Sequence, residues 1–209
     1  MSSIGGTIRR GELLPDAPPI PHAIKLMLWG GAYYWPGNTT TVDPCYRWPA
    51  LNCDCWSDQK YRSGDKPPNA NFYAGSNPAL KPGALLAVPA ALSASLSLRI
   101  RTVLGKKMLA VLTDYGGYLD DDTASNSAAY NIEGGVSEEV DAAYGSPNIL
   151  SPRRPVAGAS AAQWGPGGDY YHDLVAIFQQ LHVVDNNSET AKGGGGVPRR
   201  PPAPPICAM

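Results

Sequence analysis

Four aspartates form the densest group of side chains that could do chemistry in this chain. They are Asp114, Asp120, Asp121 and Asp122, all within residues 104–122. Paired carboxylates can act as acid and nucleophile or base in glycoside hydrolysis, and their oxygens can bind Ca²⁺. Aspartates that follow a strand are also common turn residues, which is the favoured interpretation. Strand alternation would place Asp120 and Asp122 on one face and Asp121 on the other.

A second group combines a histidine with aromatic rings. His22 opens a predicted strand and could act as a general base or bind a sugar hydroxyl, although a hydrogen bond to a backbone carbonyl is the favoured role. Six aromatic residues are candidates for ligand binding: Tyr33, Tyr34, Trp35, Tyr46, Trp48 and Trp56. Exposed rings stack on the apolar faces of sugars. A small core packed around the nearby cysteines is an equally good interpretation of these rings.

The chain has none of the short motifs of serine hydrolases, zinc proteases, P-loop NTPases or dinucleotide-binding enzymes. We therefore expect no cofactor, and Ca²⁺ at the aspartate cluster is the one ion that the sequence suggests. His182 and Asp185 bracket a predicted strand, but their spacing points them to opposite faces, so we expect no direct contact.

The four cysteines are Cys45, Cys53, Cys55 and Cys207. Three lie in the segment DPCYRWPALNCDCW, which lacks histidine and matches no standard zinc-finger spacing. A disulfide from Cys45 to either Cys53 or Cys55 is favoured, because a long irregular loop gains from a cross-link. Cys207 could close on the remaining thiol.

The composition suggests a loop-rich protein outside the cell. Of 209 residues only 17% are charged, 23 are glycine and 21 are proline, and the net charge is −1. No basic stripe suggests nucleic acid as a partner, and no apolar stretch is long enough to span a membrane. Two sequons, at Asn38 and Asn186, would accept glycans on a secreted chain. The N-terminus lacks a signal peptide, so we expect that an N-terminal region is missing from this sequence.

Residue patterns predict the elements that would position these side chains. Alternation predicts a strand over residues 22–29, and an apolar stripe predicts a helix over 104–115 that ends at Gly116. Further strands are predicted over 46–49, 83–88, 118–122, 128–133 and 182–185, and further helices over 137–144 and 169–181. The predicted domain covers residues 1–192, with long loops at 36–79 and 145–168, and an extended Gly/Pro-rich tail covers 193–209.

Short strands with a few helices and long loops predict a mostly β fold, a β-sandwich or jelly roll. The strand count is low for a complete sandwich. We therefore expect partner strands from another chain or from a missing N-terminal region.

Several blocks of the sequence resemble a known family. They are IGGTIRRGEL, IPHAIKLML, YRWPA, NPALKPGALLAVP, LTDYGGYLDDDT, LHVVDNN and GGGGVPRRPPAPP, in this order. They are similar to the C-terminal half of a family of secreted, mostly uncharacterised microbial proteins. The resemblance implies a β-jelly roll in a polysaccharide-rich setting and a further strand-rich half before the first block.

The sequence therefore predicts an extracellular domain that binds or processes polysaccharide near the aromatic loop and His22. If it is an enzyme, a glycoside hydrolase that uses the four aspartates is expected. The alternative is a non-catalytic structural or interaction subunit of an extracellular assembly.

Overall fold

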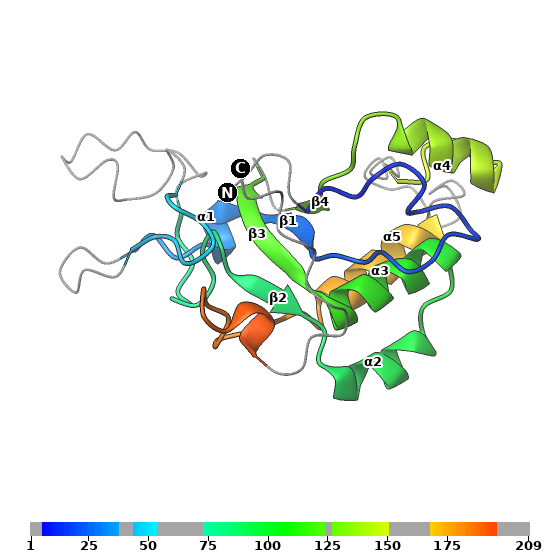
Figure 1. Cartoon of the computed structure of the whole chain (residues 1–209). Coiled ribbons are helices and arrows are strands. Elements are labelled where there is room, and N and C mark those ends of the chain that lie inside the picture. The colour runs from blue at the N-terminus through cyan, green and yellow to red at the C-terminus, as the bar shows by residue number, and fades with distance from the viewer. Residues whose placement is uncertain (1–5, 38–43, 54–72, 124–126, 151–167, 196–209) are drawn as a thin grey trace, which may run out of the picture.

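The chain folds around one five-stranded mixed sheet. The computed structural model describes residues 6–37, 44–53, 73–123, 127–150 and 168–195. The strands are β1 (Ile24–Leu28), β2 (Leu85–Ala87), β3 (Gly117–Asp122), β4 (Ala128–Tyr130) and β5 (His182–Val183). Their order across the sheet is β4-β1-β3-β2-β5 (Figure 1).

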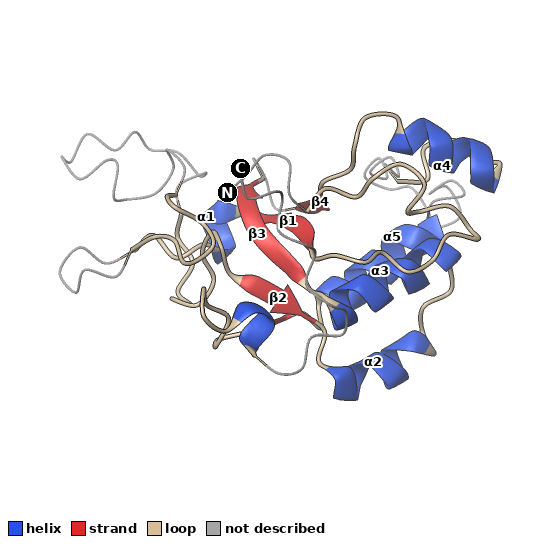
Figure 2. Ribbon diagram, in the orientation of Figure 1, coloured by secondary structure: helices blue, strands red, loops and turns tan. Residues whose placement is uncertain are grey.

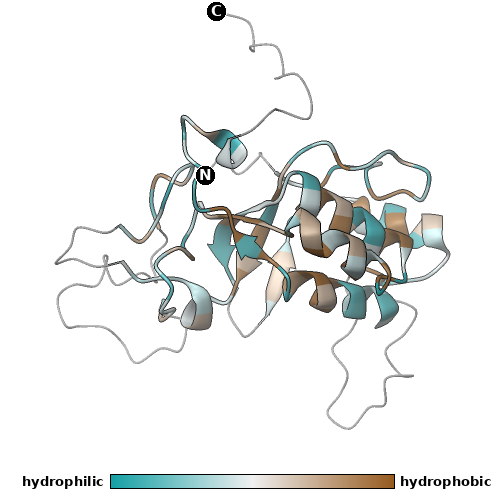
Figure 3. Ribbon diagram, turned by 90° about the horizontal axis from the view of Figure 1, so that it is seen from below, coloured by the Kyte–Doolittle hydropathy of each residue, from teal (hydrophilic) through white to brown (hydrophobic). Residues whose placement is uncertain are grey.

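Five helices accompany the sheet. They are α1 (Gly30–Tyr33), α2 (Ala90–Ser97), α3 (Val103–Asp114), α4 (Val136–Tyr144) and α5 (Gly168–Phe178), and a short 3-10 turn covers Lys192–Gly194. Helices α2, α3 and α5 gather on one side of the sheet (Figure 2). The helices carry both hydrophobic and hydrophilic residues (Figure 3). The amphipathic pattern is clear in α3 and α5 and almost absent in α2.

Strands β1 and β3 are parallel, and the other pairings between the labelled strands are antiparallel. A parallel pair cannot be joined by a tight turn, and between β1 and β3 the chain passes through α1, β2, α2 and α3. The register shifts within this pair, because Leu26 faces Leu119 whereas Met27 faces Asp121. Asp120 is therefore the extra residue of a β-bulge.

Helix α3 supplies the centre of the apolar core. Its Leu104, Met108 and Leu112 are almost fully buried, in one cluster with Leu26 and Leu119 of the central strands. The Thr102 hydroxyl caps the helix by accepting a hydrogen bond from the Gly105 amide at 2.8 Å. Gly116, with φ +73°, turns the chain from the helix into β3.

Helix α5 is tied both to α3 and to the sheet. Its buried Asp173 accepts hydrogen bonds from the Arg101 and Thr102 amides at 2.9 and 2.8 Å, and from the Thr102 hydroxyl at 2.6 Å. The hydroxyl of Tyr170 lies 2.7 Å from that of Tyr130 on β4. A polar clamp thus fastens each side of α5 within the core.

The expectation of a β-sandwich or jelly roll is wrong. The chain is an α/β mixture, 32% helical and 14% strand, with a single mixed sheet in its described residues. The layer that packs on the sheet is made of helices, so the low strand count does not by itself indicate missing strands. Strands supplied by another chain or by an N-terminal region stay a prediction.

Most local predictions are confirmed. β1, β2, β3, β4 and β5 lie where strands were expected, and α3, α4 and α5 where helices were expected. Residues 46–49 do not form the predicted strand and belong instead to a loop. Helix α2 was not predicted. In the described part of the chain, no helix is both long and apolar enough to cross a membrane.

Candidate functional site

The parallel central strands separate the predicted residues into two groups. We call the side where β1 and β3 begin the amino edge, and the side where they end the carboxyl edge. His22 precedes β1 and Asp114 precedes β3, whereas Asp121 and Asp122 end β3. Gly117, where β3 begins, is four residues before Asp121, and four residues along a strand span about 13 Å. Asp114 is therefore too far from Asp121 for a hydrolase pair, whose carboxyl groups lie about 5–9.5 Å apart.

At the amino edge, both ring nitrogens of His22 face oxygen atoms. Nδ1 lies 2.9 Å from the backbone oxygen of Ala23, and Nε2 lies 3.1 Å from Oε1 of Glu12. The same glutamate accepts the amide of Arg9 at 2.7 Å. The imidazole thus joins the N-terminal segment to β1. A hydrogen bond to a backbone carbonyl is the role that was favoured for His22 from the sequence.

In the middle of the sheet, Asp120 forms an ion pair with Lys25. The carboxylate Oδ2 and the ammonium Nζ are 2.6 Å apart, and the side chains are only 17% and 5% exposed. The bulge at Asp120 brings its side chain toward β1. An oxygen that already accepts this charge-assisted hydrogen bond is less available as a nucleophile or base.

At the carboxyl edge, Tyr34 fastens helix α1 to the ends of both parallel strands. Its hydroxyl donates to the backbone oxygen of Asp121 at 2.7 Å and accepts from the amide of Leu28 at 3.3 Å. Its ring is fully buried and meets the ring of Tyr73 edge-on, with centroids 5.1 Å apart. Tyr34 thus serves as a structural anchor of this edge.

The approach of α1 to the strand ends depends on a glycine. A Cβ atom at Gly30 would lie 2.7 Å from the ring of Tyr73 and 3.2 Å from Oδ2 of Asp122. No larger residue fits there without displacing the tyrosine ring. The small residue lets α1 lie directly against the end of β3.

Two of the described candidate residues are exposed at this edge. Tyr33 is 43% exposed, and Asp121 is exposed, with Oδ1 accepting the amide of Asp122 at 2.9 Å. The strand register places Asp121 opposite Met27, so simple alternation does not describe the aspartates. The structure thus brings the exposed Tyr33, the buried Tyr34 and two carboxylate candidates, Asp121 and Asp122, to one edge.

The other aromatic candidates lie elsewhere or are less exposed. Trp48 packs edge-on against Tyr118, with ring centroids 6.3 Å apart. Trp35 and Tyr46 are half-buried, and Trp56 lies outside the described residues. Burial raises the pKa of Tyr118, and this effect exceeds the lowering by its hydrogen bond with Asn187.

Asn187 is a junction that the sequence did not reveal. Its side-chain oxygen accepts from the Tyr118 hydroxyl at 3.2 Å and from the Gly193 amide at 2.9 Å. Its backbone oxygen accepts from the guanidinium of Arg47 at 3.3 Å, and Asp185 accepts from the same nitrogen at 2.6 Å. The only signal for this junction was turn chemistry in the block LHVVDNN.

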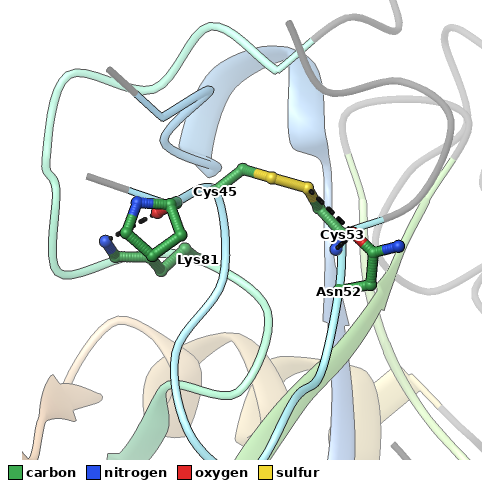
Figure 4. Close-up of a disulfide and its surroundings, with 5 residues drawn as sticks. Cys45, Asn52, Cys53 and Lys81 are labelled. Atoms are coloured by element: carbon green, nitrogen blue, oxygen red, sulfur yellow. Dashed lines mark hydrogen bonds between the residues drawn. A yellow bond between two sulfur atoms is a disulfide. The ribbon is translucent and has the colours of Figure 1, made fainter. Parts of the chain in front are cut away.

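A disulfide between Cys45 and Cys53 closes the loop that carries Arg47 and Trp48 (Figure 4). It is one of the two pairings that the sequence left open. Lys81 supports the loop by donating to the backbone oxygen of Pro44 at 3.0 Å.

The remaining candidates are the other cysteines and the two sequons. Cys55, Cys207 and Asn38 lie outside the described residues. Asn186 is exposed, and its side-chain amide donates to the backbone oxygen of Gly194.

Within the described ranges, no group of three or more His, Cys, Asp or Glu side chains is arranged to hold a metal ion. Calcium at the aspartate cluster stays a prediction, and there the ammonium of Lys25 would compete for Asp120.

The comparisons with known proteins give no relative. No family model, curated protein or solved structure matches this chain.

Proposed function

We propose that this chain binds polysaccharide at its carboxyl edge, through the ring of Tyr33 and the carboxylate of Asp121. One observation carries the proposal. The two hydrogen bonds of the Tyr34 hydroxyl hold α1 on the ends of β1 and β3. They place an exposed aromatic ring and an exposed carboxylate on one rigid support.

This pair of side chains suits a sugar. An aromatic ring buries the apolar C–H face of a pyranose, while a carboxylate accepts hydrogen bonds from the hydroxyls at its rim. Asp121 and Asp122 make the edge acidic, and an acidic sugar would meet like charge. A neutral polysaccharide is therefore the proposed ligand.

Binding is better supported than hydrolysis. Of the four candidate carboxylates, Asp120 is paired with Lys25 and Asp114 lies toward the other edge. The two that remain are neighbours in sequence, and Asp121 folds back onto the amide of Asp122.

An extracellular location is part of the proposal. A disulfide in a long loop is typical of an oxidising compartment. The resemblance to secreted microbial proteins supports the same location, and two of its blocks meet where Trp48 packs on Tyr118.

The test is affinity electrophoresis of the purified chain through gels that contain neutral or uronic acid polysaccharides. We expect retardation by a neutral polymer and a roughly tenfold weaker interaction in Tyr33→Ala, since an aromatic contact contributes about 1–1.5 kcal/mol. Tyr171→Ala is the matched control, because Tyr171 on α5 is 40% exposed against 43% for Tyr33. Equal retardation of Tyr33→Ala and wild type would refute the proposal.

A further inference from the structure

The turn that joins α2 to α3 combines exposed aliphatic and basic side chains. Leu98 is 89% exposed and Val103 is 46% exposed. Arg99, Arg101 and Lys106 are exposed beside them. We call these five residues the basic turn. Single exposed apolar residues are ordinary on protein surfaces, but an almost fully exposed leucine among three cations is a more specific combination.

Hydrogen bonds hold the basic turn in shape. The amide of Arg99 donates to the backbone oxygen of Leu96 at 2.9 Å. The amide of Arg101 donates to the buried carboxylate of Asp173 at 2.9 Å. Ile100, between them, is only 4% exposed. These contacts and the burial of Ile100 fix the backbone directly after Leu98, so the outward position of Leu98 belongs to an ordered turn.

The basic turn keeps an excess of positive charge, because its three cations outnumber the two carboxylates that contact it among the described residues, those of Asp169 and the buried Asp173. Among the described residues, the only ion pair with one of its cations is that of Arg101 with Asp169, at 3.8 Å. Those side chains are 78% and 62% exposed, so solvent screens the pair strongly. The turn therefore presents net positive charge around an apolar tip.

We propose that the basic turn docks on the surface of an anionic lipid bilayer. Leucine and valine side chains gain by entering the boundary between headgroups and acyl chains, while arginine and lysine stay at the level of the anionic headgroups. A protein partner fits less well. A stable protein interface buries about 800 Å² on each side, whereas this surface offers two aliphatic side chains at one end of the molecule.

This surface is independent of the proposed glycan site. In Figure 1, α1 lies at one end of the molecule, and the turn between α2 and α3 lies at the opposite end. The chain could therefore hold a bilayer and a polysaccharide at the same time.

The test is co-sedimentation of the full chain with vesicles of phosphatidylcholine, alone or with about 30% phosphatidylserine. We expect binding only to the anionic vesicles. Leu98→Ser should weaken binding by about tenfold, and Leu51→Ser, at an 82% exposed leucine in another loop, should leave it unchanged. Arg99→Gln with Lys106→Gln should weaken it by about 25-fold, since each cation contributes about fivefold.

A charge control is Lys192→Gln, which removes an exposed lysine outside the basic turn and should change binding little. Melting curves of each variant show that the fold is intact. The proposal is overturned if the chain does not sediment with anionic vesicles, if it binds neutral vesicles equally well, or if Leu98→Ser and Leu51→Ser bind alike. It is also overturned if a soluble polyanion binds as tightly as the vesicles and Leu98→Ser leaves both interactions unchanged.

Discussion

The ion pair between Lys25 and Asp120 is the most informative target for mutation, because it spans the parallel strands at the bulge. Lys25→Met removes the ammonium and keeps a side chain of similar length. The carboxylate of Asp120, which is only 17% exposed, then has no ammonium beside it; in the wild-type chain the Lys25 side chain is 5% exposed. Removing one partner of a buried pair costs about 3–5 kcal/mol.

The two exposures determine the order of the effects. Asp120 retains some contact with water, so we expect Lys25→Met to lower the free energy of unfolding by about 3 kcal/mol. Asp120→Asn leaves the more deeply buried ammonium without its partner and should cost about 4–5 kcal/mol. The double change Lys25→Met with Asp120→Leu removes both charges and should lie within about 1–2 kcal/mol of wild type.

Urea unfolding, followed by circular dichroism, measures these differences by linear extrapolation. Lys106→Met is the control, because it removes an exposed lysine on α3 and should cost less than about 0.5 kcal/mol. If Lys25→Met costs less than about 1 kcal/mol, or if the two single effects add in the double variant, the pairing across the bulge is wrong.

Three further predictions concern the clamps of the fold. Asp173→Asn should lower the free energy of unfolding by about 2–4 kcal/mol, because it weakens three buried hydrogen bonds. Asp169→Asn, at an exposed position one turn earlier, should lower it by less than about 0.5 kcal/mol. Equal effects in chemical unfolding would contradict the buried clamp. Burial raises the pKa of Tyr130 from 10.0 to about 12. The folded chain then keeps a proton that the unfolded chain releases, so stability is lost as pH rises from 10 through 12, by about 2–3 kcal/mol. In Tyr130→Phe the free energy of unfolding should fall less steeply between pH 10 and 12, as measured by chemical unfolding at each pH. An unchanged slope would refute the assignment to Tyr130. Replacing Cys45 and Cys53 together by serine should cost about 2–3 kcal/mol, because it frees a loop with a sequence separation of 8; calorimetry with no change in melting temperature would show that the bond is absent.

The sequence predicted the elements better than their arrangement. A strand at β1 and a helix at α3 follow from side-chain spacing, which is a local property. The parallel pairing of Ile24 with Gly117 joins residues far apart in the chain, and no local pattern encodes it. Helix α2 directly follows Pro89. It was missed because its alanines, serines and leucines show almost no amphipathic pattern.

The candidate site was predicted in its residue types but not in its grouping. The cluster of aspartates suggested a single unit, but the bulge directs Asp120 to Lys25 and leaves Asp121 exposed at the end of β3. Tyr34 was predicted as a ligand-binding ring because it lies among other aromatic residues in the sequence. The sequence does not reveal that its hydroxyl contacts the backbone of two strands. The basic turn was missed for a similar reason, since the exposure of Leu98 depends on tertiary packing.

The central claim is that the carboxyl edge binds a neutral glycan. Its most direct test is an NMR titration of the isotope-labelled chain with an oligosaccharide of the polymer that retards it. We predict that the amide resonances of Tyr33, Asp121 and Asp122 shift together and saturate, while those of the basic turn stay in place. Shifts centred on His22 at the amino edge, with none at Tyr33, would contradict the account.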